Sequence, residues 1–390
     1  MLKKTLFSVL IIIVVLGFGI KWLLDVTHLT PILSPVVSHM VLHTDPQIKN
    51  TNGVTNILLL GIGGGTHDGP NLTDTVIFAS IDQKAKKITL VSIPRDLWIP
   101  DLQGKINTAY SDGQDQGGKG LIMAKATVQK ILDQPIDYAF RIDFGGFEKA
   151  VDDVGGLDIN VSQTFDDYAY PIEGMEDASC GHSPQEISDW SNSATPSAEL
   201  DFFPCRYMHL HVDAGEQHMD GQTALRYVRS RHALGPEGSD FARSQRQQKV
   251  IAAFRAKIFS TQTLLHPDKL IALYNTLKDS IDTDITEDDY AGFIAVAQDL
   301  KNTKIENAAL DQGDSGTGRL GLLINPPISP EYGNAWVLAP RTGGDDFSEI
   351  QRYVACVLTV GNCIVTENGI ATPTPIPTTA TSMQELKNKK

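Results

Sequence analysis

Basic side chains are concentrated in one short segment of an otherwise acidic chain. The 390 residues carry a formal net charge of −14 at pH 7, but the segment 226–257 contains only two acidic residues, Glu237 and Asp240. Its eight basic residues are Arg226, Arg229, Arg231, Arg243, Arg246, Lys249, Arg255 and Lys257. Because the planar guanidinium group engages two phosphate oxygens at once, a cluster of arginines favours a site for a phosphorylated ligand.

Helical spacing brings part of this cluster to one face. If residues 240–259 form one helix, Arg243 and Gln247 share a stripe with the apolar residues Val250, Phe254 and Ile258. The apolar part of that stripe faces the core, so the two polar side chains also point inward. A buried guanidinium group without an anion is costly, which favours a phosphate site. The alternatives are a solvated basic face or structural pairing with carboxylates.

Further charged residues lie at the ends of expected strands. Arg95 and Asp96 follow the apolar run 88–94, and loops at strand ends often hold ligand groups in layered α/β folds. The alternative is a turn with a local Arg–Asp pair. Asp74 begins another strand, where its carboxylate is suited to Mg²⁺, which takes few protein ligands and keeps waters and substrate phosphates. The alternative for Asp74 is a strand cap.

The elements that position these residues alternate in type. Short apolar or alternating runs predict strands, and residues 86–87 mark a tight turn between two of them. Longer stretches with helical spacing lie between and after the strands. Such interleaving predicts an α/β fold, a layered α-β-α domain around a central mixed sheet. The expected strands are 56–61, 75–81, 88–94, 138–144 and 157–161, and the expected helical regions are 120–132, 147–154, 220–231, 240–259 and 267–301.

The N-terminus has the pattern of a membrane anchor. Lys3 and Lys4 precede an apolar run in which Lys21 is the only charge, and its length suits a helix that crosses a bilayer. We expect an uncleaved signal anchor, with the N-terminus in the cytoplasm and the rest of the chain outside the cell membrane. The alternative is a cleaved signal peptide.

Composition divides the remaining chain. Prolines and scattered polar residues indicate a stalk, a polar segment indicates an insertion, and Thr-Pro repeats indicate a disordered tail. The expected parts are a cytoplasmic stub (1–4), the transmembrane anchor (5–24), the stalk (25–52), a main domain (53–262) with an insertion at about 162–206, a C-terminal α/β extension (263–367) and the tail (368–390).

Four cysteines fall as two local pairs, Cys180 with Cys205 and Cys356 with Cys363. No CxxC with a matching His or Cys partner is present, which argues against zinc bound by cysteine. Two structural disulfides in an oxidising compartment are expected. The alternative is four unpaired structural thiols.

Some function classes are disfavoured. The acidic field of the whole chain argues against nucleic-acid binding, which requires a basic face. The glycines at 61–65 lack the Gly-Lys-Ser/Thr of a phosphate loop. The segment 313–316 matches a serine-protease nucleophile segment over only four residues, without a matching histidine segment.

Over about residues 54–260 the sequence resembles the LytR–CpsA–Psr family. No single segment is long, but their order and spacing together are specific. The matching segments are 56–61 (NILLLG), 73–75 (TDT), 92–96 (SIPRD), 105–107 (KIN), 136–138 (IDY), 143–147 (DFGGF), 154–158 (VGGLD), 215–221 (GEQHMDG), 224–231 (ALRYVRSR) and 240–248 (DFARSQRQQ).

The resemblance implies a phosphotransferase that moves a glycopolymer phosphate from a polyprenyl-pyrophosphate carrier to a peptidoglycan hydroxyl. Its partners would be the lipid-linked glycan, peptidoglycan and membrane lipid, with Mg²⁺ as cofactor. Asp74 would hold the metal, and Asp96 would either orient Arg95 or act as the base on the acceptor. The residues expected to clamp the pyrophosphate are Arg95, Arg231 and Arg243, with Arg229, Arg246 and Gln247 nearby.

One segment departs from the family pattern. Family members often follow the first strand with a Gly-Ser-Asp-Ser-Arg-like segment that supplies a metal carboxylate and an arginine. Here residues 61–68 are Gly-Ile-Gly-Gly-Gly-Thr-His-Asp. Asp68 or His67 would have to replace the missing metal ligand, or the glycine loop would bind phosphate through backbone amides.

Two other functions remain open from the sequence. In a lipid-pyrophosphate hydrolase, water would replace the sugar hydroxyl in the same cleft. A non-catalytic receptor or regulator would bind the lipid-linked glycan without turnover, and the altered metal segment gives that alternative some support.

Overall fold

A computed structural model describes most of residues 48–372. Within this range, residues 66–68, 176, 192–198, 259, 261–262, 264–265, 301–302 and 315 are not described. The expected anchor at 5–24 therefore lies outside the described residues, as do the cytoplasmic stub, most of the stalk and residues 373–390 of the tail. In the part of the chain that is described, none of the helices combines the length and apolar character needed to span a membrane.

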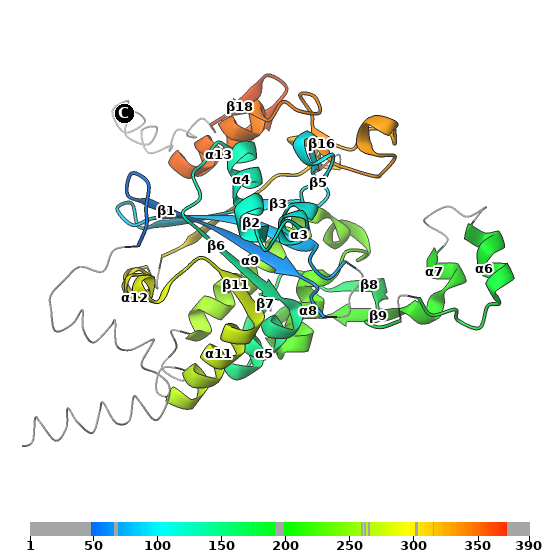
Figure 1. The fold of residues 1–390 in the computed structure, drawn as a ribbon, viewed down its shortest axis with the longest axis horizontal. Coiled ribbons are helices and arrows are strands. Elements are labelled where there is room, and N and C mark those ends of the chain that lie inside the picture. Colours follow the sequence, from blue (N-terminus) through cyan, green and yellow to red (C-terminus); the bar gives the residue numbers. More distant parts are fainter. Residues whose placement is uncertain are drawn as a thin grey trace, which may run out of the picture.

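A six-stranded mixed sheet forms the centre of the molecule (Figure 1). Its order is β11-β6-β1-β2-β3-β12. Antiparallel pairing joins β1 to β2, β2 to β3, and β6 to β11, whereas β1 with β6 and β3 with β12 are parallel. The strands are β1 (Val54–Ile62), β2 (Thr73–Asp82), β3 (Lys87–Ile93), β6 (Tyr138–Asp143), β11 (Ile281–Thr283) and β12 (Ile305–Ala309). The predicted mixed sheet is therefore confirmed.

Apolar residues cover both faces of this sheet, because successive side chains of a strand point to opposite sides. Phe78, from β2, joins a core cluster with Leu58 and Val91, whereas its neighbour Ile77 joins a separate cluster with Ile57. Phe78 is fully buried, and Ile77 is only 1% exposed. Burial on both faces requires a layer of helices on each side of the sheet, which is the predicted α-β-α arrangement.

Helices form these outer layers and a third core below the sheet. The helices α4 (Gly120–Leu132) and α13 (Ser348–Thr359) cover one face, α12 (Tyr290–Asp299) covers the other, and the N-terminal end of α3 (Thr108–Asp115) lies against β2. A further cluster joins β7 (Leu157–Val161) to helices at the lower end of the molecule in Figure 1. These helices are α5 (Phe144–Asp153), α8 (Gly221–Arg229), α9 (Asp240–Ile258) and α11 (Pro267–Ser280).

The region expected as a C-terminal extension is integrated into the main sheet. Strands β11 and β12 both lie after residue 262, yet they form the two edges of the six-stranded sheet. In β12, Ile305 pairs with Ile88 and Ala308 with Val91. The apolar strand β3 thereby gains a partner along its outer edge. The described strands after residue 262 therefore belong to the same sheet as β1, β2, β3 and β6.

The expected insertion at 162–206 begins as a strand. Strand β8 (Phe165–Pro171) pairs with β9 (Tyr207–Val212) to form a ribbon, and α6 (Pro184–Ser191) and α7 (Glu199–Phe202) project from its far end (Figure 1). Phe165 and Tyr170 are buried against the lower core, which explains why this polar segment is ordered where it meets the body.

Residues 369–371, which were expected to belong to a disordered tail, form a strand. Strand β18 (Gly369–Ala371) pairs with β17 (Ile364–Thr366), and both Val365 and Ile370 pack against the main core. Other short elements are β4 (Trp98–Ile99), β5 (Gly104–Lys105), β10 (Gly215–Met219), β13 (Gly313–Asp314), β14 (Arg319–Leu320), β15 (Leu323–Ile324) and β16 (Ala339–Pro340). The short 3₁₀ helices are η1 (Pro100–Leu102), η3 (Pro204–Arg206), η4 (Gly235–Gly238), η5 (Glu287–Asp289) and η6 (Pro330–Tyr332).

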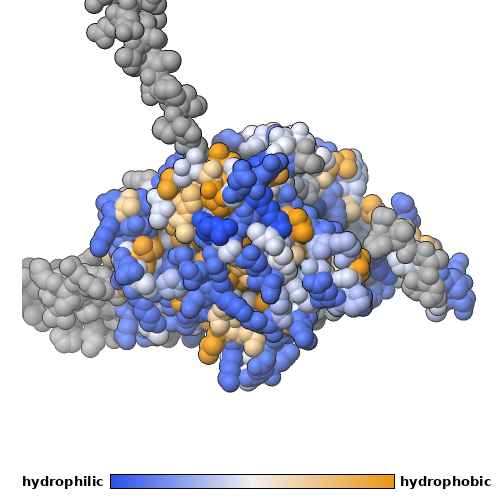
Figure 2. Space-filling model, turned by 90° about the horizontal axis from the view of Figure 1, so that it is seen from above, coloured by the Kyte–Doolittle hydropathy of each residue, from blue (hydrophilic) through white to orange (hydrophobic). Residues whose placement is uncertain are grey.

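Hydrophilic residues dominate the face shown in Figure 2, where hydrophobic residues occur in small separate groups. Such scattered exposed hydrophobic residues are normal on a protein surface.

Both expected disulfides are present, Cys180–Cys205 and Cys356–Cys363. Because each cross-link restricts the unfolded chain and contributes about 2–4 kcal/mol, we expect reductant to lower the melting temperature. The measurement is a thermal melt with and without dithiothreitol, with the double variant Cys356→Ser/Cys363→Ser used to assign the effect to one bond. An unchanged melting temperature in reductant would contradict a stabilising role for these bonds.

Candidate functional site

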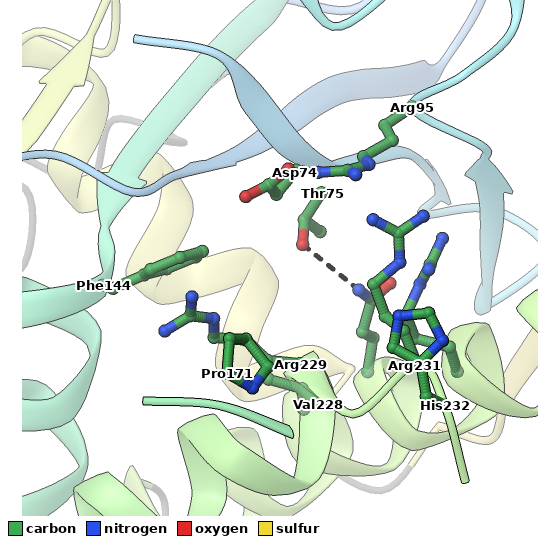
Figure 3. A pocket seen from close by; sticks show the side chains of 11 residues that line it. Asp74, Thr75, Arg95, Phe144, Pro171, Val228, Arg229, Arg231 and His232 are labelled. Carbon is green, nitrogen blue, oxygen red and sulfur yellow. Dashed lines mark hydrogen bonds and ion pairs between the residues drawn. The ribbon is translucent and has the colours of Figure 1, made fainter. Parts of the chain in front are cut away.

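A cavity of about 260 Å³ opens where the sheet meets α5, α8 and α9 (Figure 3). Segments far apart in the sequence contribute to it: the start of β2, the loop after β3, the start of α5, the end of β8, and α8 and α9 with the loop that joins them. The lining residues are Asp74, Thr75, Arg95, Phe144, Pro171, Val228, Arg229, Arg231, His232, Arg243 and Gln247. Five of the residues predicted to bind pyrophosphate therefore lie in one cavity: Arg95, Arg229, Arg231, Arg243 and Gln247.

The charge of this cavity is opposite to that of the whole chain. Four arginines line it, and Asp74 is the one carboxylate among the described lining residues. The chain as a whole has a net charge of −14. Positive charge gathered in a concave site of an acidic protein strengthens the local field and attracts an anionic ligand. The cavity is therefore suited to a small, multiply charged anion such as a pyrophosphate group.

Asp96 fixes two of these arginines from behind the cavity wall. Its Oδ2 lies 3.5 Å from Arg95 Nε and 3.4 Å from Arg231 Nη2, while its Oδ1 accepts a 2.7 Å hydrogen bond from Lys105 Nζ. Arg95 also pairs with Asp74 through its Nη1. Asp96 is only 5% exposed and does not line the cavity. This geometry favours the role of orienting arginines over that of a base on the acceptor.

The electrostatics of Asp96 agree with that role. Burial by itself would raise the pKa of the carboxyl, but the hydrogen bond from Lys105 and the charges of Arg95, Lys105 and Arg231 together hold the pKa below its usual value. A carboxylate with a lowered pKa stays ionised and is a weak proton acceptor. Asp96 therefore contributes a fixed negative charge that holds the arginines in place.

This pKa shift predicts how stability depends on pH. Because the pKa of Asp96 is lower in the folded chain than its ordinary value of 3.8, its contribution to stability is fully present above that value and is lost as the pH falls through the folded pKa. We expect Asp96→Asn to lower the free energy of unfolding at pH 7 by about 1–3 kcal/mol. The difference from the unaltered chain should shrink in acid, as measured by urea unfolding at several pH values. A difference that stays constant with pH would contradict this account.

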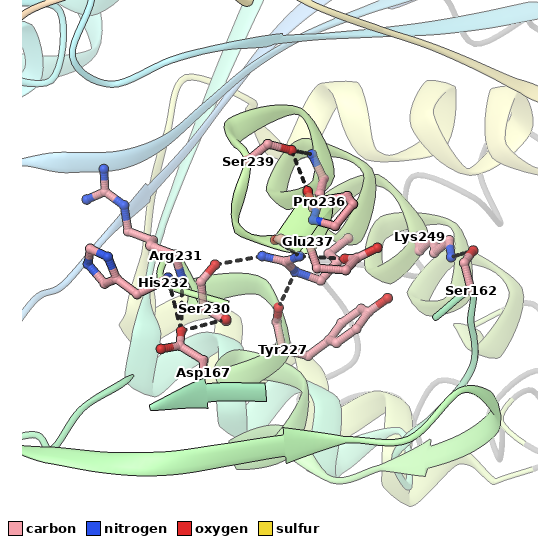
Figure 4. Close-up of polar contacts among 12 residues, drawn as sticks. Ser162, Asp167, Tyr227, Ser230, Arg231, His232, Pro236, Glu237, Ser239 and Lys249 are labelled. Atoms are coloured by element: carbon pink, nitrogen blue, oxygen red, sulfur yellow. Dashed lines mark hydrogen bonds and ion pairs between the residues drawn. The ribbon is translucent and has the colours of Figure 1, made fainter. Parts of the chain in front are cut away.

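Asp167 anchors the loop that carries Arg231 (Figure 4). This fully buried residue of β8 accepts a 2.7 Å hydrogen bond from Ser230 Oγ, and the backbone amides of Arg231 and His232 donate to it at 3.2 Å. The loop leaves α8 at this point and turns into the cavity. Asp167 therefore fixes the backbone positions from which the side chains of Arg231 and His232 extend, although it does not line the cavity itself.

The helical stripe predicted from the sequence is confirmed for its two polar residues. Arg243 and Gln247 both come from α9, one turn apart, and both line the cavity. Gln247 Nε2 donates a 3.2 Å hydrogen bond to Thr75 Oγ1 at the start of β2 (Figure 3). This contact ties α9 to the sheet beside Asp74.

Arg246 departs from the sequence prediction, because its side chain lies outside the cavity. Its guanidinium group is 2% exposed and donates to the backbone oxygens of Tyr227, Ser230 and Glu237 at 2.6–3.0 Å (Figure 4). It also forms a 2.8 Å ion pair with the Glu237 carboxylate. Adjacent helix residues point about 100° apart, so Arg246 cannot share the direction of Gln247. Arg246 holds α8, η4 and α9 together.

Arg229 lies in the cavity as predicted, with its guanidinium group 4.3 Å from the centre of the Phe144 ring (Figure 3). An arginine above an aromatic face is attracted by the ring's electron density and keeps its planar donors free to turn toward an anion. The two residues come from different helices, α8 and the start of α5. Their contact closes the cavity on the side away from Arg95.

Comparison with known proteins identifies the family. The model of the LytR_cpsA_psr family matches residues 35–319. The chain belongs to the LytR–CpsA–Psr family. The match extends beyond residue 260, where the sequence resemblance ends, and it includes β11 and β12 of the main sheet.

Two curated relatives of the chain are named as transferases. The chain is 29% identical over 222 residues to the polyisoprenyl-teichoic acid–peptidoglycan teichoic acid transferase TagV of Bacillus subtilis, a match covering 55% of this chain and 46% of the relative. It is also 29% identical to the transferase TagU of Bacillus cereus, covering 74% of this chain and 81% of the relative. The match to the first of these relatives thus spans about half of that protein's length.

Solved structures share the fold of this LytR–CpsA–Psr family member. The crystal structure of a protein from Streptococcus agalactiae superposes with a TM-score of 0.51 at 22% sequence identity. The superposition covers 81% of this chain and 89% of the other.

The predicted metal ligands are only partly placed by the structure. Asp68 and His67 lie outside the described residues. Asp74 lines the cavity, and its Oδ1 accepts a hydrogen bond from Arg95. Its other carboxylate oxygen points away from that arginine (Figure 3). One carboxylate in an arginine-lined cavity is compatible with Mg²⁺, which is commonly held by one or two carboxylates together with substrate phosphates.

Within the glycine segment, the amide of Gly64 is bonded inside the loop and is not offered to a ligand. Gly64 adopts the left-handed conformation, with φ of 70°, and its amide donates to the carbonyl of Pro70. A side chain at this position would collide with Asp143, because a Cβ atom would lie 2.7 Å from the Cβ of that residue. The glycine is therefore explained by close packing against the end of β6, and its amide is already bonded within the loop.

Sequence reasoning missed several residues of the site. Thr75 and Phe144 line the cavity, and both lie in segments that match the family. The position of Thr75 next to Asp74, and that of Phe144 at the start of a helix, could have indicated a place in the site. His232 follows directly after Arg231. Asp167 had only a weak sign, because it interrupts a short alternation of aromatic residues within a segment that is polar overall.

Proposed function

We propose that this chain is a membrane-anchored phosphotransferase that moves a glycopolymer phosphate from a polyprenyl-pyrophosphate carrier to a peptidoglycan hydroxyl. The observation that carries the proposal is the cavity in which four arginines surround a space of about 260 Å³ with one carboxylate among its described lining residues. The family membership and the transferase names of the curated relatives support the same function.

The cavity residues would act chiefly by binding and by charge stabilisation. Phosphoryl transfer demands anchored phosphates, neutralised charge and an aligned acceptor rather than covalent chemistry by the protein. Arg95 and Arg231, held by Asp96, would engage the pyrophosphate from the sheet side. Arg243 and Arg229 would engage it from the helices.

Of the two phosphate groups in the carrier, the one attached to the glycan is transferred and the one attached to the polyprenyl chain is released. The acceptor oxygen of peptidoglycan bonds to the phosphorus atom attached to the glycan, and the bond from that phosphorus to the bridging oxygen breaks. The bridging oxygen leaves with polyprenyl phosphate, and the hydroxyl proton is released. The arginines stabilise the negative charge that develops on the bridging oxygen as it leaves.

Mg²⁺ is part of this proposal, with Asp74 as its ligand in the described residues. When bound, the ion would neutralise phosphate charge beside the arginines. Asp74 would then exchange part of its pairing with Arg95 for the metal, which frees a guanidinium edge for the substrate. Asp68 is the second proposed ligand and comes from the neighbouring undescribed segment.

We also propose that the apolar run at 5–24 anchors the chain in the cell membrane with the cavity on the outer side. A polyprenyl carrier is a membrane lipid and peptidoglycan is outside the membrane, so both substrates can reach a cavity tethered there. The short positive start of the sequence favours this orientation.

The test uses the full chain in detergent with a synthetic polyprenyl-pyrophosphate glycan and peptidoglycan fragments, with and without Mg²⁺. Mass spectrometry should find a phosphodiester-linked product that requires Mg²⁺. Release of the glycan phosphate into water, with none on the acceptor, would replace the proposal with a hydrolase. Tight carrier binding without turnover across a panel of acceptor fragments would replace it with a receptor.

A further inference from the structure

A group of histidine and aspartate side chains lies on the β8–β9 ribbon, outside the cavity. His209 and His211 alternate with the buried residues Leu210 and Val212 along β9, so both imidazoles stand on the outer face. Asp166 of β8 is paired in register with His211. One potential ligand atom from each of the three residues lies within 4.8 Å of the other two.

Both imidazoles approach the same carboxylate oxygen. Asp166 Oδ1 lies 2.7 Å from His209 Nε2 and 2.7 Å from His211 Nδ1. Two imidazole nitrogens and a carboxylate oxygen are typical ligands of Zn²⁺, at bond lengths of about 2.0–2.2 Å. Tetrahedral bonds of that length place donors about 3.3 Å apart. The two Asp166–imidazole spacings therefore need to widen by only about 0.6 Å, and the ligand atoms of the two histidines lie within 4.8 Å of each other.

The surroundings of both imidazoles hold them in the orientation that a metal requires. His211 Nε2 lies 3.2 Å from the carboxylate of Asp213, which leaves Nδ1 directed at Asp166. Ligating histidines typically donate their second ring nitrogen to such a carboxylate. The ring of His209 stacks on Tyr168, with centroids 4.1 Å apart and an angle of 5° between the planes. Each ring thus has a support separate from the shared carboxylate.

We propose that Asp166, His209 and His211 form a binding site for Zn²⁺, with water as the fourth ligand. Asp213 and Tyr168 would position the two imidazoles. The ribbon that carries these three residues also supports the arginine-lined cavity. The carbonyl of Asp166 accepts a hydrogen bond from the amide of Leu234, and its neighbour Asp167 holds the loop of Arg231. A metal that joins β8 to β9 would stabilise this support.

The test measures Zn²⁺ binding to the untagged full chain after metal removal, by competition with a chromophoric chelator. We expect one saturable site that His209→Ala and His211→Ala each remove, and that Asp213→Asn weakens about 10–100-fold. Co²⁺ in place of Zn²⁺ should give the visible absorption of a tetrahedral site, and this absorption should disappear in the same histidine variants.

The matched control is His218→Ala. His218 is also exposed on a two-stranded ribbon and lies 2.6 Å from a carboxylate, that of Asp158, but no third ligand joins this pair among the described residues. Its replacement should leave Zn²⁺ affinity unchanged. The proposal is overturned if no saturable binding occurs, or if binding survives in both the His209 and His211 variants. Melting temperatures without metal verify that the variants are folded, and Gln in place of Ala at either histidine provides a second variant.

Discussion

Replacement of Arg243 by alanine is expected to lower the rate of glycopolymer transfer about 10²–10³-fold, as does the loss of one preorganised donor in other charge-stabilised reactions. Arg243 lines the cavity from α9 and is only 8% exposed, so its charge acts in a site largely shielded from water. Shielding strengthens the interaction of a guanidinium group with developing negative charge. The measurement is the rate of product formation at saturating carrier.

A lysine of the same helix provides the control for this variant. Lys249→Ala removes one positive charge from α9. Lys249 does not line the cavity, because its side chain contacts Asn160 and Ser162 instead. We expect near-normal transfer by this variant. Arg243→Lys keeps the charge without the planar donors, so an intermediate rate is expected. Equal activity in Arg243→Ala and Lys249→Ala would move the phosphate site elsewhere.

Replacement of Arg246 is expected to have the largest effect on stability, about 3–5 kcal/mol, because it removes a buried guanidinium group and leaves the partly buried carboxylate of Glu237 without its partner. The guanidinium group also satisfies the backbone oxygens of Tyr227, Ser230 and Glu237, which would remain buried. Urea unfolding of Arg246→Met, monitored by circular dichroism, measures this loss.

A double-mutant cycle separates the ion pair from the backbone contacts. If the ion pair dominates, Arg246→Met/Glu237→Leu should recover part of the stability that Arg246→Met loses. A matched replacement, Arg226→Met on α8, should cost much less, because Arg226 is only partly buried. If Arg246→Met melts like the unaltered chain but loses carrier binding, then Arg246 acts on the substrate, as its sequence position suggested.

Local sequence patterns determined the individual elements of this protein. The apolar runs at 56–61, 75–81 and 88–94 became β1, β2 and β3. Successive side chains of a strand point to opposite faces, so a continuous apolar run favours a strand that is buried on both faces. The pairing of Arg243 with Gln247 followed from helical periodicity, which fixes neighbours three and four residues apart. Periodicity could not relate Arg95, Arg231 and Arg243 to one another, and their expected common role came from the family motifs.

Contacts between residues that are far apart in the sequence became known only from the tertiary structure. Arg231 and Asp96 are 135 positions apart, and no periodic pattern encodes their contact. The short strand β12 joins the sheet because β3 has an open edge, which depends on the completed topology. Asp166 meets His209 and His211 through strand register, and Arg246 points into η4 rather than the cavity. Sequence patterns specify burial and local neighbours, whereas long-range contacts depend on how the elements pack together.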